Sequence, residues 1–237
     1  MTEEETVQIT AADQKPKLDK MVLLRFVIGI AAYNVLMIFF INNLIFHYIA
    51  APRAAYYISI SISNLLFFAL ILIIKTDKSL SWGDIGLKPV KIAAGLIDML
   101  KIWFLAWLLS LFYMFFIIDS GINVPENKLL IILQNPSLAM LILNIVLIAV
   151  IAPFVEEILF RGLLLGSLRT YCGPWTAIVI SAAIFSALHL ELLGFVPRLI
   201  LGIALGYLYI KHNSILPSIA LHAFNNLLAV LVITFLA

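Results

Sequence analysis

Charge is scarce in this chain of 237 residues: only 12% are Asp, Glu, Lys or Arg, whereas 64% are hydrophobic. Soluble domains carry roughly 25% charged residues, so this composition cannot cover a water-facing surface. The single cysteine excludes a disulfide framework. The low contents of glycine (11) and proline (9) exclude collagen-like and disordered chains. The net charge of +2 is too small to indicate nucleic acid as a partner.

Long apolar runs fill most of the sequence. Because about 20 apolar residues cross a bilayer, the predicted fold class is all-α, a polytopic membrane helix bundle of about eight transmembrane helices. The predicted spans are 21–46, 54–74, 92–118, 137–152, 155–170, 175–190, 196–210 and 216–236. Only Ala152 and Pro153 separate the fourth span from the fifth, and the proline predicts a sharp turn or kink there.

The predicted organisation is a polar, flexible cytoplasmic tail over residues 1–20 and a single transmembrane domain over 21–237. Lys and Arg favour cytoplasmic loops. They are concentrated before the first span and after the second, whereas the loops after spans one and three carry only Arg53 and Lys128. With eight spans, both termini are expected in the cytoplasm. The short loops and compact length favour a prokaryotic cell membrane.

Several ionisable residues lie within predicted spans of the C-terminal half. Placing such a residue inside a membrane costs roughly 2.5–3.5 kcal/mol. Glu157 and Arg161 are four residues apart, so they share a helix face and can pair. Glu156 points about 100° away from that pair, which predicts that it faces a cavity. The alternative is that both carboxylates lie in the first turn of a helix, where the helix dipole favours anions.

The polar residues that follow are His189, at the end of a span, and His222 with Asn226, which are four apart on one face of the last span. A face of this kind suits an oxyanion hole, a metal site or an interhelical contact. Asn225 lies on another face and is expected to pack between helices. Glu156, His189 and His222 could also form a two-histidine, one-carboxylate metal set, but no zincin-like spacing supports zinc.

Three motifs occur in order: Glu156-Glu157-Ile-Leu-Phe-Arg161 fits EExxxR, Phe185-Ser-Ala-Leu-His189 fits FxxxH, and His222-Ala-Phe-Asn-Asn226 fits HxxxN. Together they resemble the CPBP family of CaaX proteases and bacteriocin-processing enzymes, also called the Abi family. The resemblance covers about residues 150–230, the CPBP-like catalytic core. This segment is similar to the Ras-converting CaaX protease.

This resemblance implies an intramembrane glutamate endopeptidase that acts on a prenylated or otherwise membrane-associated peptide or protein, without a metal cofactor. Glu156 and His189 would activate the attacking water, and His222 and Asn226 would stabilise the oxyanion. Glu157 and Arg161 would support the site. The alternatives are a metal-dependent version of the same protease, a non-catalytic scaffold or chaperone of the same fold, and a proton-relaying transporter.

The predicted spans place the candidate catalytic residues at different depths in the membrane. Glu156 begins span five and His189 ends span six on one side of the membrane, whereas His222 begins span eight on the other. Either residues 190–197 dip into the membrane, or spans seven and eight are short and strongly tilted. The site is therefore expected in a conical intramembrane cavity that opens to the cytoplasm.

Overall fold

The computed structural model describes residues 18–76, 80–123 and 130–236, so almost all of the predicted tail lies outside the described residues. Every regular element in this part is helical, which confirms the all-α class. In chain order the elements are α2 (Lys20–Val35), η1 (Leu36–Ile41), α3 (Asn42–Tyr48), α4 (Pro52–Ile74), α5 (Ile92–Asp119), α6 (Leu130–Leu133), α7 (Leu138–Asn144), η2 (Ile145–Ile151), α8 (Ala152–Glu157), η3 (Ile158–Leu165), α9 (Gly166–Cys172), α10 (Pro174–Ala187), α11 (Leu192–His212) and α12 (Leu216–Leu236).

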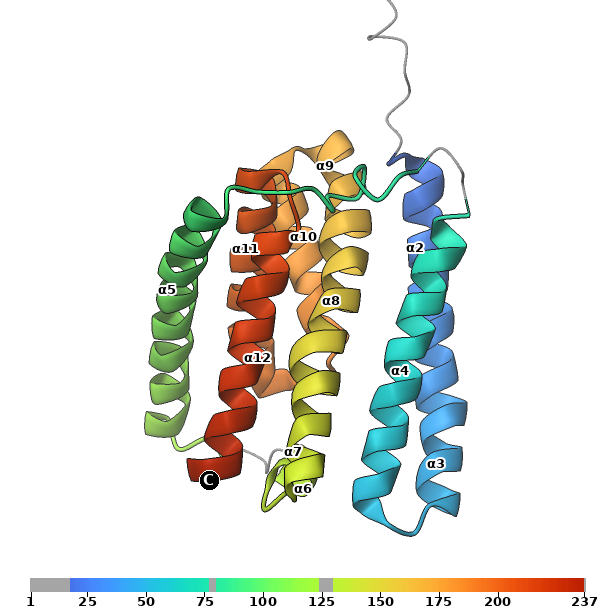
Figure 1. Ribbon diagram of the computed structural model, residues 1–237, viewed down its shortest axis with the longest axis vertical. Helices are drawn as coiled ribbons and strands as arrows, with labels where there is room; N and C mark the ends of the chain where they lie inside the picture. Colours follow the sequence, from blue (N-terminus) through green and yellow to red (C-terminus); the bar gives the residue numbers. More distant parts are fainter. Residues whose placement is uncertain (1–17, 77–79, 124–129, 237) are drawn as a thin grey trace, which may run out of the picture.

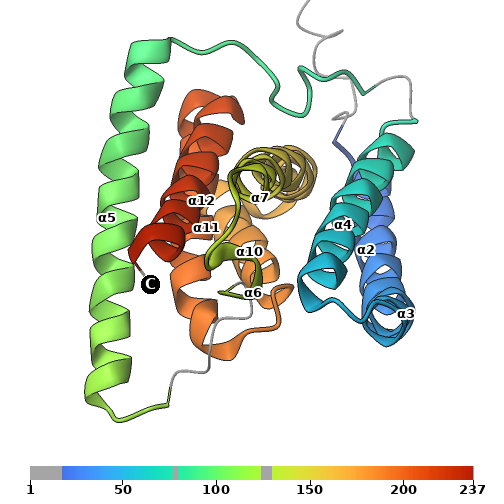
Figure 2. The ribbon, with the colours of Figure 1, turned by 60° about the horizontal axis from the view of Figure 1, so that its bottom comes forward.

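Six continuous helices in the described part are long and apolar enough to cross a membrane, and α10 is a shorter apolar helix. Their outer surfaces carry large exposed side chains such as Phe104 and Phe112 on α5. An exposed apolar surface is favourable in lipid and costly in water, so the chain is an integral membrane protein. Helix α5 packs against α11 and α12 at one edge of the bundle, away from the paired helices α2–α3 and α4 (Figures 1 and 2).

The predicted separation of spans four and five at Pro153 is wrong. Leu138–Cys172 is one continuous helical segment of 35 residues, so predicted spans four and five are one crossing. Proline lacks an N–H and its ring clashes with the carbonyl one turn earlier. The π-helical segment η2, Ile145–Ile151, directly precedes α8 and widens that turn, which accommodates the ring without breaking the helix.

The bundle has two chemically different ends (Figure 1). At one end, Arg25 near the start of α2 donates to the carbonyl of Ile74, the last residue of α4. Ile215, just before α12, donates to the carbonyl of Gly86 in the segment between α4 and α5. We call this the basic end, because the described residues Lys20, Arg25, Lys75, Lys88, Lys91, Arg169 and Lys211 lie there.

The opposite end contains the end of α3, the start of α4, α6 and the end of α12. There Arg53 donates to the carbonyls of Ile131 and Gln134, and Thr234 donates to that of Leu133. The start of α2 and the end of α12 therefore lie at opposite ends of the bundle (Figure 1). The prediction that both termini are cytoplasmic stays a prediction, because the structure contains no membrane.

Short helix α10 resolves the predicted difference in depth. Its 14 residues extend about 21 Å, less than the hydrocarbon thickness of about 30 Å. The turn between α10 and α11 therefore lies within the bundle, as the first of the two sequence-based options required (Figure 1). Close packing holds the two helices together, since a Cβ on Gly202 of α11 would lie 2.9 Å from the Cβ of Ala182 on α10. Small residues four apart, such as Gly202 and Gly206, allow this close approach of helices.

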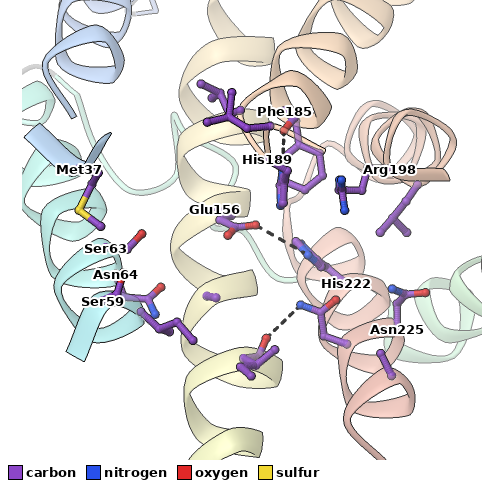
Figure 3. Close-up of a pocket in the computed structure, with 18 of the residues that line it drawn as sticks. Met37, Ser59, Ser63, Asn64, Glu156, Phe185, His189, Arg198, His222 and Asn225 are labelled. Atoms are coloured by element: carbon purple, nitrogen blue, oxygen red, sulfur yellow. Dashed lines mark hydrogen bonds and ion pairs between the residues drawn. The ribbon is translucent and has the colours of Figure 1, made fainter. Parts of the chain in front are cut away.

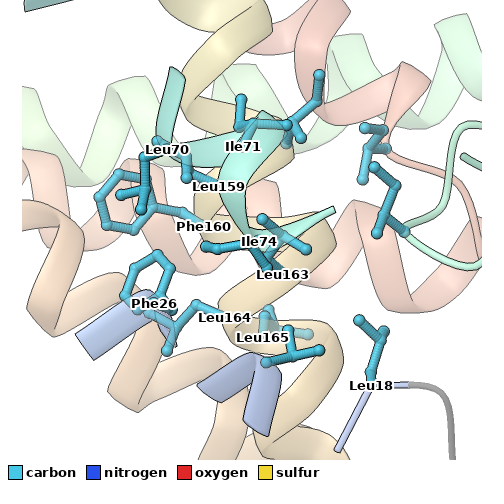
Figure 4. Packing of buried hydrophobic residues seen from close by; sticks show 14 of the residues in the cluster. Leu18, Phe26, Leu70, Ile71, Ile74, Leu159, Phe160, Leu163, Leu164 and Leu165 are labelled. Carbon is cyan, nitrogen blue, oxygen red and sulfur yellow. The ribbon is translucent and has the colours of Figure 1, made fainter. Parts of the chain in front are cut away.

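The main buried apolar core lies in the half of the bundle next to the basic end (Figure 4). It joins the first turns of α2 to the last turns of α4 and to η3, through Phe26, Ile74 and Leu163, among others. Ile85, from the segment between α4 and α5, also belongs to this core and is 1% exposed. The segment 80–91 thus closes the basic end of the core.

We predict that Gly162→Ala destabilises the protein, because the added Cβ would lie 2.7 Å from the backbone carbonyl oxygen of Ile85. Overpacking of this kind costs about 1–3 kcal/mol. Gly83→Ala is the matched control, since its nearest neighbour is the Ser81 hydroxyl at 3.7 Å. Thermal unfolding in detergent would measure both. Equal melting temperatures for the two variants would contradict this account of the closed end.

Candidate active site

Glu156 and Glu157 are adjacent but have opposite environments. Both lie at the end of α8, near the middle of the 35-residue helical segment. The alternative that they occupy the first turn of a helix is therefore wrong. Glu157 is fully buried, whereas the Glu156 side chain is 18% exposed and lines a cavity. The difference follows from helical geometry, which turns successive side chains by about 100°.

Glu157 is the centre of a buried polar cluster that also contains Arg161 and His222. Its Oε1 accepts from Arg161 Nη1 at 2.9 Å and lies 2.8 Å from His222 Nδ1. Arg161 also donates to the Gly202 carbonyl at 3.3 Å, and its guanidinium lies 4.6 Å from the centre of the Phe185 ring. The ion pair predicted from the four-residue spacing is present. The contact between Glu157 and His222, 65 residues away, was not predicted.

His222 has a fixed orientation because a carboxylate accepts hydrogen bonds and its partner nitrogen must donate. Nδ1 therefore carries a hydrogen directed at Glu157, and Nε2 is the nitrogen left for other contacts. Nε2 lies 3.8 Å from Glu156 Oε2, which is too long for a hydrogen bond. Figure 3 shows the His222 ring directed toward Glu156.

His189 lies just beyond the end of α10 and is oriented by the same reasoning. Its Nδ1 is 2.9 Å from the backbone carbonyl oxygen of Phe185. A carbonyl only accepts, so Nδ1 carries the hydrogen and Nε2 is free to face the cavity. The rings of His189 and His222 both make edge contacts with Phe185, at centroid distances of 5.0 and 5.7 Å. The Phe185 ring thus contacts both histidines and helps to set the distance between them.

Asn226 shares the cavity-facing side of α12 with His222, as predicted. Its Nδ2 donates to the carbonyl of Ile148 in η2 at 3.0 Å, which fixes the amide and leaves its second N–H available. Asn225 points toward α5 and borders a second pocket with Trp103 and Arg198, in keeping with its predicted position between helices (Figure 3).

All four residues predicted as catalytic line one cavity of about 560 Å³ between the α2–α4 pair and the C-terminal helices. Figure 3 shows Glu156, His189 and His222 pointing toward one another. Sequence reasoning missed the polar side chains that α2, α3 and α4 contribute to the opposite wall, which are Asn34, Asn42, Ser59, Ser63 and Asn64. The spacing of Ser59 and Ser63, four apart on one helix face, was the available signal.

Arg198 was also missed. It follows Pro197 in α11, lines the cavity and pairs with Glu191 at 2.9 Å. Its position within a predicted span was a usable signal, because an arginine there is costly.

In the described part of the chain, no three His, Cys, Asp or Glu side chains converge closely enough to hold a metal ion. One nitrogen of His222 is already directed at Glu157. The absence of a metal cofactor stays a prediction, which the chelator experiment below addresses.

We predict that Arg161→Met destabilises the protein by roughly 3–5 kcal/mol, because it leaves the Glu157 carboxylate buried without its cation. The double variant Glu157→Gln with Arg161→Met should recover a large part of this loss, since it removes both charges. Unfolding in detergent measures the free energies. A double variant as unstable as the sum of the single variants would contradict the pairing.

Residues 138–228 match the family model described as type II CAAX prenyl endopeptidase, Rce1-like. No curated protein and no solved structure matches the chain. The matched segment contains all three motifs and the helices that carry Glu156, His189 and His222. The match confirms the resemblance predicted from the motifs: the segment 138–228 of this integral membrane protein is similar to the Rce1-like CAAX prenyl endopeptidase family.

Proposed function

We propose that this protein is a glutamate-dependent intramembrane endopeptidase that cleaves a membrane-associated peptide or protein. The observation that carries the proposal is the convergence of Glu156, His189, His222 and Asn226, from three separate parts of the chain, on one cavity. Ionisable groups are costly at this depth, and here they surround a space large enough to admit a peptide segment and water. The CAAX prenyl endopeptidase description of the family supports a peptide bond as the target.

Glu156 is the proposed general base. Its carboxylate faces the cavity, and the free Nε2 of His189 faces the same space. A water held between the two would lose a proton to Glu156 while its oxygen attacks the scissile carbonyl carbon. Glu156 would then pass that proton to the departing amine nitrogen as the C–N bond breaks. The products are a carboxylic acid and an amine, and Glu156 is again an unprotonated carboxylate.

His222 and Asn226 are the proposed oxyanion donors. The Nε2–H of a protonated His222 and the second Nδ2–H of Asn226 can be directed at the tetrahedral oxygen. Such donors act most strongly when they are fixed before the reaction. Glu157 holds His222, and the carbonyl of Ile148 holds Asn226. Glu157 and Arg161 are therefore positioning residues in this proposal.

We predict that Glu156→Gln lowers kcat by about 10²–10⁴-fold while folding is retained, because an amide cannot accept the proton of water. Asp119→Asn, at the exposed end of α5, is the matched control and should keep full activity. Cleavage of a prenylated CaaX peptide and of an unprenylated lipid-anchored peptide would be measured in detergent, with and without a zinc chelator. Activity abolished by the chelator would favour the metal-dependent alternative.

We predict that Asn226→Ala lowers kcat by about 10²–10³-fold with little change in KM, because the lost hydrogen bond forms chiefly in the transition state. Asn225→Ala, on the neighbouring face of α12, is the control for disturbance of the helix. Equal losses in both variants would indicate a structural effect. A wild-type protein that cleaves neither peptide, but captures a partner from the membrane, would favour the scaffold alternative.

A further inference from the structure

The cavity occupies only one half of the bundle. On α12 its lining runs from His222 to Ile233, toward the end that carries Thr234 and α6. On the long helix it runs from Glu156 back to Ile148, in the same direction. The turn after α10 also borders the cavity, where Leu190 is 70% exposed. The cavity thus extends from the reacting groups toward the end of the bundle opposite the basic end.

The other half is closed to a substrate. Between Glu156 and the basic end, the helices enclose the main apolar core (Figure 4). Phe160, one turn from Glu156 on the same helix, is 2% exposed and packs edge-on against Phe26 and Phe185. The segment that contains Ile85 covers this core at the end of the bundle. Opening a route there would require taking apart the best-packed part of the protein.

The distribution of cations assigns the two ends to the two sides of the membrane. In the described residues, Lys and Arg at helix ends and in short connections lie at the basic end, with Arg53 the exception at the other. Lys and Arg are retained on the cytoplasmic side of membrane proteins, particularly in short loops next to the spans. The basic end is therefore the cytoplasmic end, and the cavity faces the non-cytoplasmic side.

We propose that the substrate is a membrane-associated peptide presented from the non-cytoplasmic half of the bilayer, such as an exported, lipid-anchored peptide. This inference rests on the proposed peptidase function and reverses the sequence-based expectation of a cavity open to the cytoplasm. The wall formed by α2, α3 and α4 suits such a substrate. Its hydroxyl and amide groups, linked through Tyr33–Ser63 and Ser59–Asn42 hydrogen bonds of 2.6 and 2.7 Å, offer partners to an extended backbone.

Cysteine labelling tests the sidedness without requiring activity. Cys172→Ser removes the single native cysteine, and Leu190→Cys or Lys91→Cys then places one thiol at the cavity mouth or the basic end. We expect a membrane-impermeant maleimide to label Leu190→Cys in intact bacterial cells, and Lys91→Cys only after permeabilisation. Labelling of Leu190→Cys in intact cells no faster than that of Lys91→Cys would overturn the proposal.

Cleavage in oriented membranes tests the substrate class. A lipid-anchored peptide added from outside should be cleaved at least about tenfold faster by right-side-out vesicles than by inside-out vesicles, because a peptide backbone crosses hydrocarbon poorly. Faster cleavage by inside-out vesicles would overturn the proposal. An assay of the detergent-solubilised protein measures the peptidase activity independently of the side from which the substrate is added. Inactivity there would refute the peptidase function, whereas the labelling result would still decide which way the cavity faces.

Discussion

A carboxylate buried in an apolar helix bundle must be paired, and the arrangement of this site depends on how Glu157 meets that requirement. Its Oε1 accepts from Arg161 on the same helix and contacts His222 on α12. Arg161 reaches onward to the Gly202 carbonyl of α11 and to the Phe185 ring of α10. One buried charge thus ties together the three helical segments that carry the candidate catalytic groups and α11 beside them, because leaving any member unpaired is costly.

The neighbouring carboxylate has no arginine partner, and this difference underlies the role that we propose for it. Glu156 projects into the cavity, where it faces His189 and the second nitrogen of His222 rather than an arginine (Figure 3). A carboxylate neutralised by arginine is a poor base, whereas one that faces a confined space can exchange protons with water. The two adjacent glutamates therefore suit different tasks, support and reaction.

The bundle is also divided along its length. Its half at the basic end is solid with apolar side chains, and the half beyond Glu156 contains the hollow cavity, whose walls carry amides and hydroxyls among apolar side chains. A peptidase within a membrane needs water at one point and must exclude it elsewhere. The solid half holds the helices at fixed positions, so the hollow half can keep its shape around an open space.

Composition and local spacing were enough to determine the membrane class, the Glu157–Arg161 pair, the shared face of His222 and Asn226, and the resemblance of the C-terminal part to the family. These properties depend on helical periodicity, which acts over a few residues. Only the tertiary structure decided that Pro153 lies within one continuous helix, that short α10 ends within the bundle, and that His222 contacts Glu157. The tertiary structure also decided that α2, α3 and α4 form one wall of the cavity and that the cavity lies away from the basic end. Contacts between residues far apart in the sequence depend on helix lengths and packing, which local spacing does not specify.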